Sequence, residues 1–591
     1  MTTTAGDSSV PAQRPRGVAG FLRALVRRSE VWLVVCAVLV GVGAGALVTL
    51  MSRVSQLAHT LIFGIPLDQH LSASAVVAPA VALTAPVIGG LALGAMEWWR
   101  RRENIPAAVD PVEANALQGG RMSLRDSVVV SLQTLISNGC GASVGLEAGY
   151  SQIGAGLASR LGIGLRVRRN DLRILVGCGA AGAIAAAFGA PLTGAFYAFE
   201  LIIGFYSVSN AAAVAAAALA AVLTTRSLGG APYSIDITAT AGTQLSHYLV
   251  ILVLGMLVSA LGIAVMRSVA LVEQGFEKSR IPYWLRPATG GLVVGGLALI
   301  SPQVLAAGHG AMQLDLPLDI PAATLATLIG LKLTATLVSL GSGFRGGLFF
   351  ASLFVGALAG KLFGKGVEAA LPGLGMDPIA CALAGMGVLA VAIVGGPLTM
   401  SFLVLETTGD FGLTGAVLTA CVAASLFVRE TFGYSFSTWR LHLRGESIRS
   451  AHDVGWIRTL TVGKLMRREQ RTIPAAATLA EFRRRYPLGS ASTVTALDDQ
   501  DRYAGMVSTP DAFAAGRADS AKVSDIIKLP KTVLTPEMNI KDALAMFDES
   551  ESEALAVVDE DQKVLGILTE GYAVRRYATE VEQANRGLMG D

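Results

Sequence analysis

The first 450 residues of this 591-residue chain contain little charge. Of its 91 charged residues, 40 lie in residues 451–591 (40/141, about 28%), which leaves 51 for the first 450 (51/450, about 11%). A soluble protein carries roughly a quarter of its residues as charged side chains. The chain therefore divides into a long charge-poor segment and an ordinary charged one. Its net charge of only +3 excludes a strongly basic nucleic-acid binder, and no nucleic-acid partner is expected.

Cysteine is also scarce and shows no paired spacing. The five cysteines all lie in the charge-poor segment, at Cys36, Cys140, Cys178, Cys381 and Cys421. An odd number without paired spacing argues against a disulfide framework or a metal cluster, and the six histidines show no ligand spacing. The chain lacks the G-x-x-x-x-G-K-[ST] phosphate loop. We therefore expect no metal site, no required cofactor and no enzymatic activity.

Long apolar runs fill the charge-poor segment. Residues 31–52 contain no charged side chain, and a membrane-spanning helix needs about 20 apolar residues. Further runs occupy about 76–99, 172–203, 208–225, 246–271, 286–301, 320–341, 346–371, 378–407 and 412–428. This pattern predicts an α-helical protein that crosses the cell membrane many times.

The flanks of these runs indicate the orientation. Residues 1–30 contain five arginines, and Trp98 and Trp99 precede three more at 100–102. Positive side chains favour the cytoplasmic ends of spanning helices, and tryptophans favour the membrane interface. We therefore predict that the N-terminus and the charged C-terminal segment are both cytoplasmic.

The charge-poor segment contains an internal repeat. The sequence G-A-P-L-T-G-A-F-Y-A-F-E at 189–200 matches G-G-P-L-T-M-S-F-L-V-L-E at 395–406. Upstream, G-L-E-A-G at 145–149 pairs with G-F-R-G-G at 343–347. Apolar helices interrupted by Gly and Pro in repeated halves are typical of transporter folds with a site at the membrane midplane. Close helix packing through small residues is the alternative explanation, and two matched pairs disfavour it.

Glu147 is the most informative candidate residue. It lies in a glycine-flanked break of the apolar segment, where an ionisable side chain is costly and indicates function. Helix N-termini at such breaks offer N–H groups that suit an anion. A carboxylate there blocks the anion when charged and leaves when protonated, which predicts a proton-linked gate. Glu200 and Glu406 could act similarly, or each could be a structural carboxylate that caps a neighbouring loop.

Four ordered motifs resemble the CLC family of chloride channels and transporters over about residues 31–445. S-V-G-L-E-A-G-Y-S-Q-I-G at 143–154 is similar to the Gly-Lys/Arg-Glu-Gly-Pro element, and F-G-A-P-L-T-G at 188–194 to the stretch that follows it. G-G-L-F-F-A-S at 346–352 is similar to the Gly-x-Phe-x-Pro element, and G-Y-S at 433–435 to a late tyrosine. The resemblance implies a homodimer in the lipid bilayer, with one pathway for chloride or another small anion in each subunit.

The resemblance also implies roles for individual residues. Glu147 corresponds to the external gating glutamate. Leu348 and Phe349, preceded by Gly347, offer backbone N–H groups to the anion, and Tyr434 offers its hydroxyl. A phenol and amides bind chloride without a full counter-charge, so the anion can also leave.

The first departure from the family pattern concerns anion selectivity. The Gly-Ser-Gly-Ile-Pro motif is expected about forty residues before Glu147, where residues 104–111 read N-I-P-A-A-V-D-P. Its serine is absent, and Ala107 or Ala108 is nearest, which leaves the preferred anion open. Arg345 is an added cation in the second break, and we expect it to restore positive potential at the pore entrance.

The second departure concerns proton coupling. Proton-coupled members of the family commonly carry a second glutamate directly after the position of Glu200, and this chain has Leu201 there. A leucine cannot hold a proton. The substitution favours passive anion conduction over tight anion/proton exchange, with Glu200 as the remaining candidate on a proton pathway.

The charged C-terminal segment is repetitive as well. V-G-K-L-M at 462–466 pairs with V-S-D-I-I at 523–527, and Y-A-G-M-V-S-T-P-D at 503–511 pairs with V-L-G-I-L-T-E-G-Y at 564–572. These two units resemble a tandem of cytosolic α/β CBS domains over about 458–580, with repeats at about 458–515 and 520–580.

The CBS resemblance implies an adenine nucleotide as a regulatory ligand. In that family the pattern Gly-x-x-Ser/Thr-x-x-Asp holds the phosphate and ribose, and Gly505, Ser508 and Asp511 match it. The second repeat has Thr569 but Tyr572 in place of the Asp. In the alternative interpretation the hydroxyls only cap helices and the module only dimerises.

We therefore predict a polytopic α-helical membrane protein with an inverted repeat and broken helices, followed by an α/β CBS pair. The expected layout is a leader at 1–30, a membrane domain at 31–445, a linker at 446–457, the CBS module at 458–580 and a tail at 581–591. The function is that of a chloride channel or weakly proton-coupled anion transporter. The alternatives are a chloride/proton antiporter, a CBS-regulated divalent-cation transporter and a membrane-anchored nucleotide sensor. Few membrane carboxylates are available for a cation cage, and the ordered repeat argues against a mere anchor.

Overall fold

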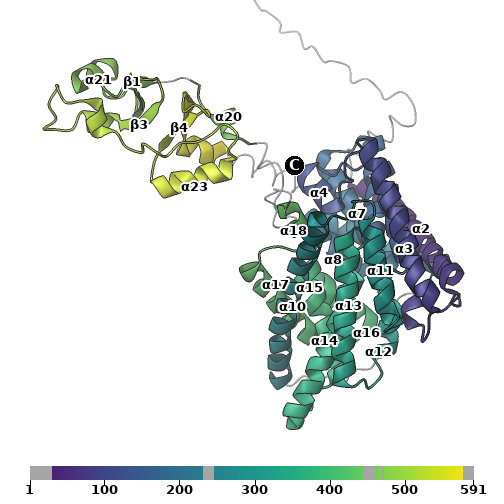
Figure 1. Ribbon diagram of the computed structural model, residues 1–591. Coiled ribbons are helices and arrows are strands. Elements are labelled where there is room, and N and C mark those ends of the chain that lie inside the picture. The colour runs from purple at the N-terminus through teal and green to yellow at the C-terminus, as the bar shows by residue number, and fades with distance from the viewer. Residues whose placement is uncertain (1–29, 231–244, 444–459, 469–470, 577–591) are drawn as a thin grey trace, which may run out of the picture. The chain divides into compact units, whose positions relative to one another are not determined.

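The computed structural model describes residues 30–230, 245–443, 460–468 and 471–576. The chain divides into two compact units, Met1–Asp453 and Val454–Asp591, which are considered separately (Figure 1). The predicted leader before residue 30, the linker at 446–457 and the tail at 581–591 lie outside the described residues.

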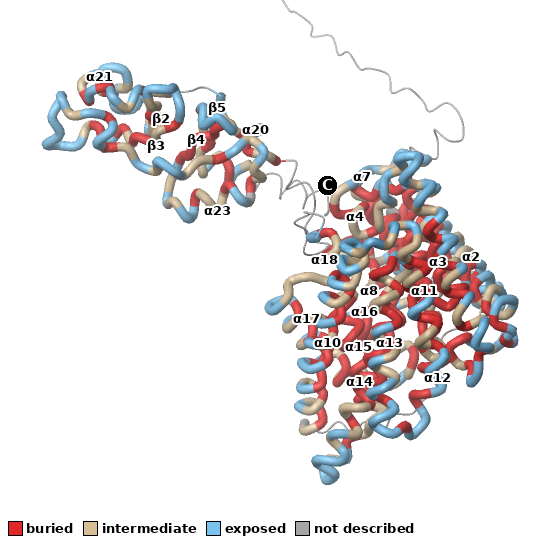
Figure 2. The backbone as a smooth tube through the Cα atoms, viewed as in Figure 1, coloured by how far each residue is buried: buried red, intermediate tan, exposed pale blue. Residues whose placement is uncertain are grey.

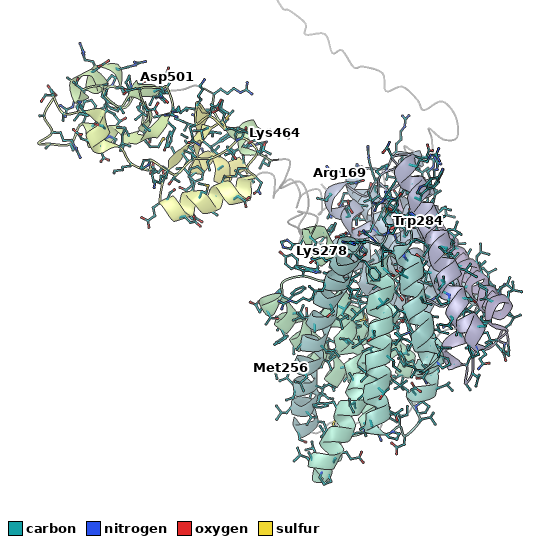
Figure 3. The ribbon with its side chains drawn as sticks, in the orientation of Figure 1. Arg169, Met256, Lys278, Trp284, Lys464 and Asp501 are labelled. Carbon is teal, nitrogen blue, oxygen red and sulfur yellow. The ribbon has the colours of Figure 1, made fainter. Side chains whose placement is uncertain are left out.

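The first unit is a bundle of helices. Eight of the described helices are long and apolar enough to cross a membrane, and they correspond to eight of the ten apolar runs of the sequence. The runs at 286–301 and 378–407 contain shorter helices. The helices are α2 (Glu30–Phe63), η1 (Leu71–Ala73), α3 (Pro79–Arg102), α4 (Pro111–Leu117), α5 (Leu124–Gly139), α6 (Glu147–Leu165), α7 (Arg169–Phe188), α8 (Pro191–Tyr197), η2 (Ala198–Ile203), α9 (Val208–Ser227), α10 (Leu245–Lys278), α11 (Arg286–Ala298), η3 (Pro302–Val304), α12 (His309–Asp315), α13 (Ala322–Ser342), α14 (Phe349–Ala370), η4 (Pro372–Leu374), α15 (Pro378–Val394), α16 (Pro397–Thr408), α17 (Phe411–Thr431) and α18 (Phe436–Leu443). Met256 lies within α10, Lys278 ends that helix, and Trp284 lies in the connection to α11 (Figure 3).

Two of the apolar runs are broken helices, as the Gly-Pro motifs predicted. The run at 172–203 is interrupted where Gly189 (φ 67°) ends α7 and Pro191 begins α8. The run at 378–407 is interrupted where Gly395 and Gly396 (φ 93° and 75°) separate α15 from Pro397 and α16. Glycine tolerates this positive φ, and proline is suited to a first helical turn because it has no N–H to leave unpaired.

Two of the longer helices of this unit, α5 and α6, lie outside the apolar runs found in the sequence. Their buried residues include many Ser, Gln, Asn and Gly side chains, such as Ser131 and Gln133 in α5 and Ser151 and Gln152 in α6. Helix α6 contacts protein over most of its surface, whereas α5 buries its polar side chains against protein and exposes Val128, Val129 and Leu132. Hydropathy alone therefore does not reveal them.

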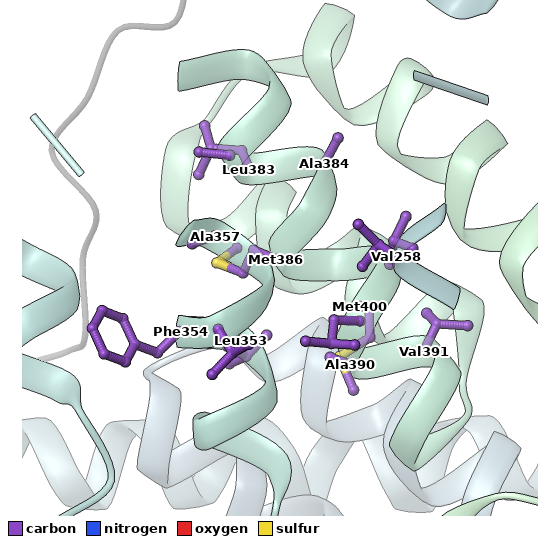
Figure 4. Close-up of a cluster of buried hydrophobic side chains, with 14 of the residues drawn as sticks. Val258, Leu353, Phe354, Ala357, Leu383, Ala384, Met386, Ala390, Val391 and Met400 are labelled. Carbon is purple, nitrogen blue, oxygen red and sulfur yellow. The ribbon is translucent and has the colours of Figure 1, made fainter. Parts of the chain in front are cut away.

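The largest core cluster of the unit joins α10, α14, α15 and α16. Val258, Leu353, Met386 and Met400 come one from each of these helices and are at most 4% exposed (Figure 4). Most of α15 is buried (Figure 2).

Equivalent glycines bring helices together in both halves of the repeat. A Cβ on Gly154 of α6 would lie 2.4 Å from the carbonyl O of Gly179 in α7. A Cβ on Gly356 of α14 would likewise lie 2.4 Å from the carbonyl O of Gly385 in α15. The two pairs are separated by about 200 residues, as the sequence motifs are. The repeat is therefore a repeat of packing as well as of sequence.

The second unit contains two strand–helix repeats. Its elements are α20 (Val462–Leu465), β1 (Thr472–Pro474), α21 (Leu479–Arg485), β2 (Thr493–Leu497), β3 (Tyr503–Ser508), α22 (Thr509–Ala512), η5 (Val523–Ile526), α23 (Ile540–Ser550), β4 (Ala554–Val558) and β5 (Val564–Thr569). Strand β1 is parallel to β2, which is antiparallel to β3. In the second half Leu534 bridges Val557 in parallel, and β4 is antiparallel to β5. Both hairpins have a register irregularity, at 496/497 and at 557/558, so the two halves share one topology.

Candidate anion site

The first breaks of the two repeats meet in space. The backbone N–H of Gly145 donates to the carbonyl O of Gly347 (3.0 Å), and the N–H of Gly347 donates to the carbonyl O of Gly145 (3.0 Å). The bridge is antiparallel, as expected for halves of opposite orientation. Leu146 and Leu348 are the N-cap residues of α6 and α14. Glu147 and Phe349 are therefore equivalent: each is the first residue of its helix. The sequence motifs had instead paired Glu147 with Arg345, four residues earlier than Phe349.

The carboxylate of Glu147 occupies the space between the two breaks. A Cβ on Gly145 would lie 1.9 Å from Glu147 Oε2, and one on Gly347 would lie 3.4 Å from the same atom. The side chain is 3% exposed, and its carboxylate is within hydrogen-bonding reach of the backbone N–H of Phe350 in the first turn of α14. Among the described residues Oε2 has no hydrogen-bond partner. Burying a carboxylate with an unsatisfied oxygen costs free energy.

The second breaks are closed by carboxylates from the opposite repeat. Glu200 Oε1 accepts from the N–H of Leu398 (3.0 Å), and its Oε2 accepts from the N–H (2.8 Å) and the hydroxyl (2.6 Å) of Thr399. Glu406 accepts in the same way from Leu192 N–H (2.8 Å) and from Thr193 N–H (2.8 Å) and hydroxyl (2.7 Å). These contacts place both glutamates as reciprocal helix caps.

The N-termini of the four helices at the breaks differ in whether a glutamate from the other repeat caps them. The N-termini of α8 and α16 receive Glu406 and Glu200. Those of α6 and α14 begin at Leu146 and Leu348, whose side chains make no cap hydrogen bond. Orphan N–H groups and the positive helix dipole make such termini suited to an anion. The candidate site is therefore at the start of α14, where the Glu147 carboxylate now lies.

A cavity of about 400 Å³ leads to this point. Its lining includes six of the residues predicted from the sequence: Ala108, Glu147, Arg345, Gly347, Leu348 and Phe349. Ala107, Glu200, Leu201 and Tyr434 are not part of the lining among the described residues. Leu201 packs near Gly395, where a Cβ would lie 3.1 Å from Leu201 Cδ2.

Tyr434 lies away from the predicted position. Its hydroxyl is 3.2 Å from His442 Nδ1, and its ring stacks on the imidazole with centroids 4.5 Å apart. The residue precedes α18, whereas Phe436, the first residue of that helix, lines the cavity. The placement does not support Tyr434 as an anion ligand, because the chain enters α18 two residues later and directs an aromatic ring without a hydroxyl at the cavity.

Residues 104–111, which stand where the family's serine motif is expected, lead into α4. The helix begins at Pro111, and Asp110 caps it by accepting from the N–H of Glu113 (2.8 Å). Ala108 and Asp110 line the cavity. The segment contributes a methyl group and a carboxylate to the cavity in place of the family's serine.

The charges along the cavity are balanced. The described lining contains five arginines (Arg100, Arg101, Arg286, Arg345 and Arg440) and five carboxylates (Glu97, Asp110, Glu147, Glu273 and Glu277). Glu97 pairs with Arg100 and Arg101 at 2.7 Å, and Arg440 lies 3.7 Å from Glu273. Arg345 is therefore one of several arginines and is the one that lies on the break before Gly347.

Sequence reasoning missed several hydroxyls in the cavity lining, among them those of Tyr197 and Ser151. Ser151 follows Glu147 by one helical turn and shares its face of α6. Tyr197 lies within the first P-L-T motif, six residues after Pro191. Helical periodicity could have pointed to Ser151, and the repeated P-L-T motif could have pointed to Tyr197.

Three of the residues predicted to hold a nucleotide lie in β3 or directly after it. Gly505 (φ 145°) adjoins the next segment closely, since a Cβ there would lie 2.8 Å from the carbonyl O of Lys528. Ser508 is the N-cap residue of α22, and Asp511 forms an ion pair with Lys528 (2.6 Å). Thr569 ends β5. The first repeat therefore combines a helix start, a carboxylate and a cation.

Comparisons with known proteins agree with these features. The family described as "Voltage gated chloride channel" matches residues 89–429, and "CBS domain" matches 523–578. A voltage-gated ClC-type chloride channel ClcB of Citrobacter koseri is 31% identical over 351 residues, covering 59% of this chain and 84% of that protein. The ClcB of Salmonella typhimurium is 30% identical over 403 residues, covering 66% and 95%.

Solved structures show the same fold. A slow cyanobacterial Cl-/H+ antiporter superposes with a TM-score of 0.59 at 23% identity, covering 70% of this chain and 97% of that one. A eukaryotic CLC transporter gives a TM-score of 0.58 at 18% identity, covering 93% and 98%. None of these matches supports the divalent-cation transporter.

Proposed function

Because the chain belongs to the CLC family of voltage-gated chloride channels, we propose that it passes chloride or a similar small anion across the cell membrane, with Glu147 as the gate. The observation that carries the proposal is the position of the Glu147 carboxylate at the start of α14, between Gly145 and Gly347. An anion and a carboxylate compete for the same N–H groups. The charged carboxylate excludes the anion, and the protonated one releases the site.

Passive or weakly coupled conduction is the favoured mode. Leu201 cannot carry a proton, and both oxygens of Glu200 are engaged by Leu398 and Thr399. A proton-coupled antiporter is the second candidate, because proteins of this fold are described as Cl-/H+ and F-/H+ antiporters. In that case protons would have to reach Glu147 by water or by another residue.

Reconstitution into liposomes tests the proposal. Chloride efflux and proton uptake are measured together on the full chain under a chloride gradient. A channel gives efflux without proton accumulation against a gradient, and a weakly coupled transporter gives a variable ratio. Proton pumping at a fixed ratio would establish the antiporter instead. Absence of anion flux under every ionic and pH condition would contradict the proposed function.

Several further features complete the proposal. We expect a homodimer with one pathway in each subunit and both termini in the cytoplasm. The CBS module is expected to bind an adenine nucleotide through Gly505, Ser508 and Asp511, and Thr569 is the matching hydroxyl of the second repeat. Asp511 lies beside Lys528, a cation suited to a phosphate group.

A further inference from the structure

The anion cavity lacks the side-chain hydroxyls that the family resemblance implied. Tyr434 faces His442, Ala108 brings only a methyl group, and Phe436 brings a ring without a hydroxyl. Of the donors that the resemblance implied, only the backbone N–H groups at the start of α14 remain in the described lining. An anion bound by these alone would face an incomplete shell of donors.

Tyr197 and Ser151 bring hydroxyls to the same place from two other helices. Tyr197 ends α8, and its ring lies 6.2 Å from the ring of Phe349, centroid to centroid. Its hydroxyl is within hydrogen-bonding reach of the Ser151 side chain and within electrostatic range of Glu147. Ser151 is 4% exposed and lies one turn after Glu147 on α6. Helices α6, α8 and α14 thus converge on one part of the cavity lining.

The backbone after Tyr197 favours this placement. Residues Ala198–Ile203 form a π-helical turn directly after α8. Such turns shift the helical phase of the side chains around them and occur often at functional sites. Here the turn directly follows Tyr197, which lines the cavity, and contains Glu200, which caps α16.

We propose that Tyr197 is the side chain that donates a hydrogen bond to the anion in this protein, and that Ser151 positions its hydroxyl. This inference rests on the proposed anion conduction. A neutral O–H donor suits a conducted anion because it orients toward the charge without holding it by a full counter-charge. The Ser151 hydroxyl can accept a hydrogen bond from the phenol or donate one to it. When an anion arrives, both O–H groups can rotate away from each other and toward the anion.

Chloride binding to the purified full-length protein tests the assignment. Tyr197→Phe removes only the oxygen, and we expect about ten-fold weaker chloride binding by calorimetry, which corresponds to about 1.4 kcal/mol. Liposome flux should show a lower preference for chloride over nitrate, because the discriminating donor is lost. Tyr248→Phe is the matched control: this partly buried tyrosine on α10 lies outside the described cavity lining, and the substitution should change neither quantity.

Variants of Ser151 separate positioning from folding. Ser151→Ala should reduce the preference for chloride over nitrate by a smaller factor, and Ser151→Thr, which keeps the hydroxyl, should restore it. Equal chloride affinity in wild type and Tyr197→Phe would overturn the assignment, as would a change confined to proton uptake. If the wild-type protein neither binds nor passes chloride, the proposed function itself fails. That outcome is distinct from failure of the Tyr197 assignment, in which wild type and Tyr197→Phe bind chloride equally well.

Discussion

At the scale of single residues, we expect the side chain of Glu147 to decide whether the site at the start of α14 is open. In Glu147→Gln the group can no longer take a negative charge, so flux should vary little between pH 4 and pH 8. Wild-type flux should fall as pH rises through the titration of the carboxyl, by up to about ten-fold per pH unit for a single group. Liposome efflux over this pH range measures both. Glu368→Gln, which alters an exposed glutamate on α14, should keep the wild-type profile.

Gly145 makes room for that carboxylate. In Gly145→Ala the new Cβ would meet Glu147 Oε2 at 1.9 Å, so the carboxylate must leave its position. We expect raised chloride flux at neutral pH, similar to that of Glu147→Gln, and a loss of stability of about 1–3 kcal/mol from overpacking. The control is Gly164→Ala in α6, where no atom lies within 4 Å of the new Cβ. Low, wild-type flux in a folded Gly145→Ala protein would contradict this account of the closed gate.

At the scale of elements, the carboxylates of Glu200 and Glu406 join the two repeats. Glu406→Ala removes three hydrogen bonds at the start of α8, and charged acceptors at helix N-termini contribute about 1.5–3 kcal/mol each when well formed. We expect a lower unfolding temperature in detergent, by several degrees, with Glu406→Gln intermediate. Glu368→Ala should leave the temperature unchanged. An unaltered melt combined with lost flux would instead indicate a role in transport.

The same scale shows what sequence could and could not predict. The apolar runs, the Gly-Pro breaks and the repeat were visible because lipid contact and helix interruption leave local patterns. Helix α6 was indicated only by the small residues that follow the first break, Y-S-Q-I-G-A-G-L-A-S at 150–159, because most of its surface is buried against protein. Helix α5 was missed, because polar side chains on its buried face interrupt the apolar pattern. The pairing of Glu147 with Phe349 depends on a contact between distant segments, which no local pattern records. The turn of Tyr434 toward His442 spans only eight residues, but the matched motif G-Y-S carries no signal for it.

At the scale of the whole molecule, the CBS module offers a route by which nucleotide could control anion flux. A ligand that binds the folded state raises its stability by RT ln(1 + [L]/Kd). A nucleotide that alters flux must bind the conducting and closed states with different affinity. Glu147 and Asp511 would then be linked thermodynamically across two units of one chain.

The test of this route uses Asp511, whose carboxylate is suited to ribose hydroxyls and is held by Lys528 at 2.6 Å. With ATP or AMP as the probe, we expect calorimetry on the full chain to show binding by wild type and at least about ten-fold weaker binding by Asp511→Asn, which loses a charged acceptor worth about 1.5–3 kcal/mol. Asp548→Asn, an exposed aspartate on α23, is the control. If neither nucleotide binds wild type, the module serves dimerisation rather than nucleotide sensing. In that case we expect the dimer to weaken when β3 or β5 is disrupted. If nucleotide binds but flux is the same with and without it, the site exists and the coupling to Glu147 does not.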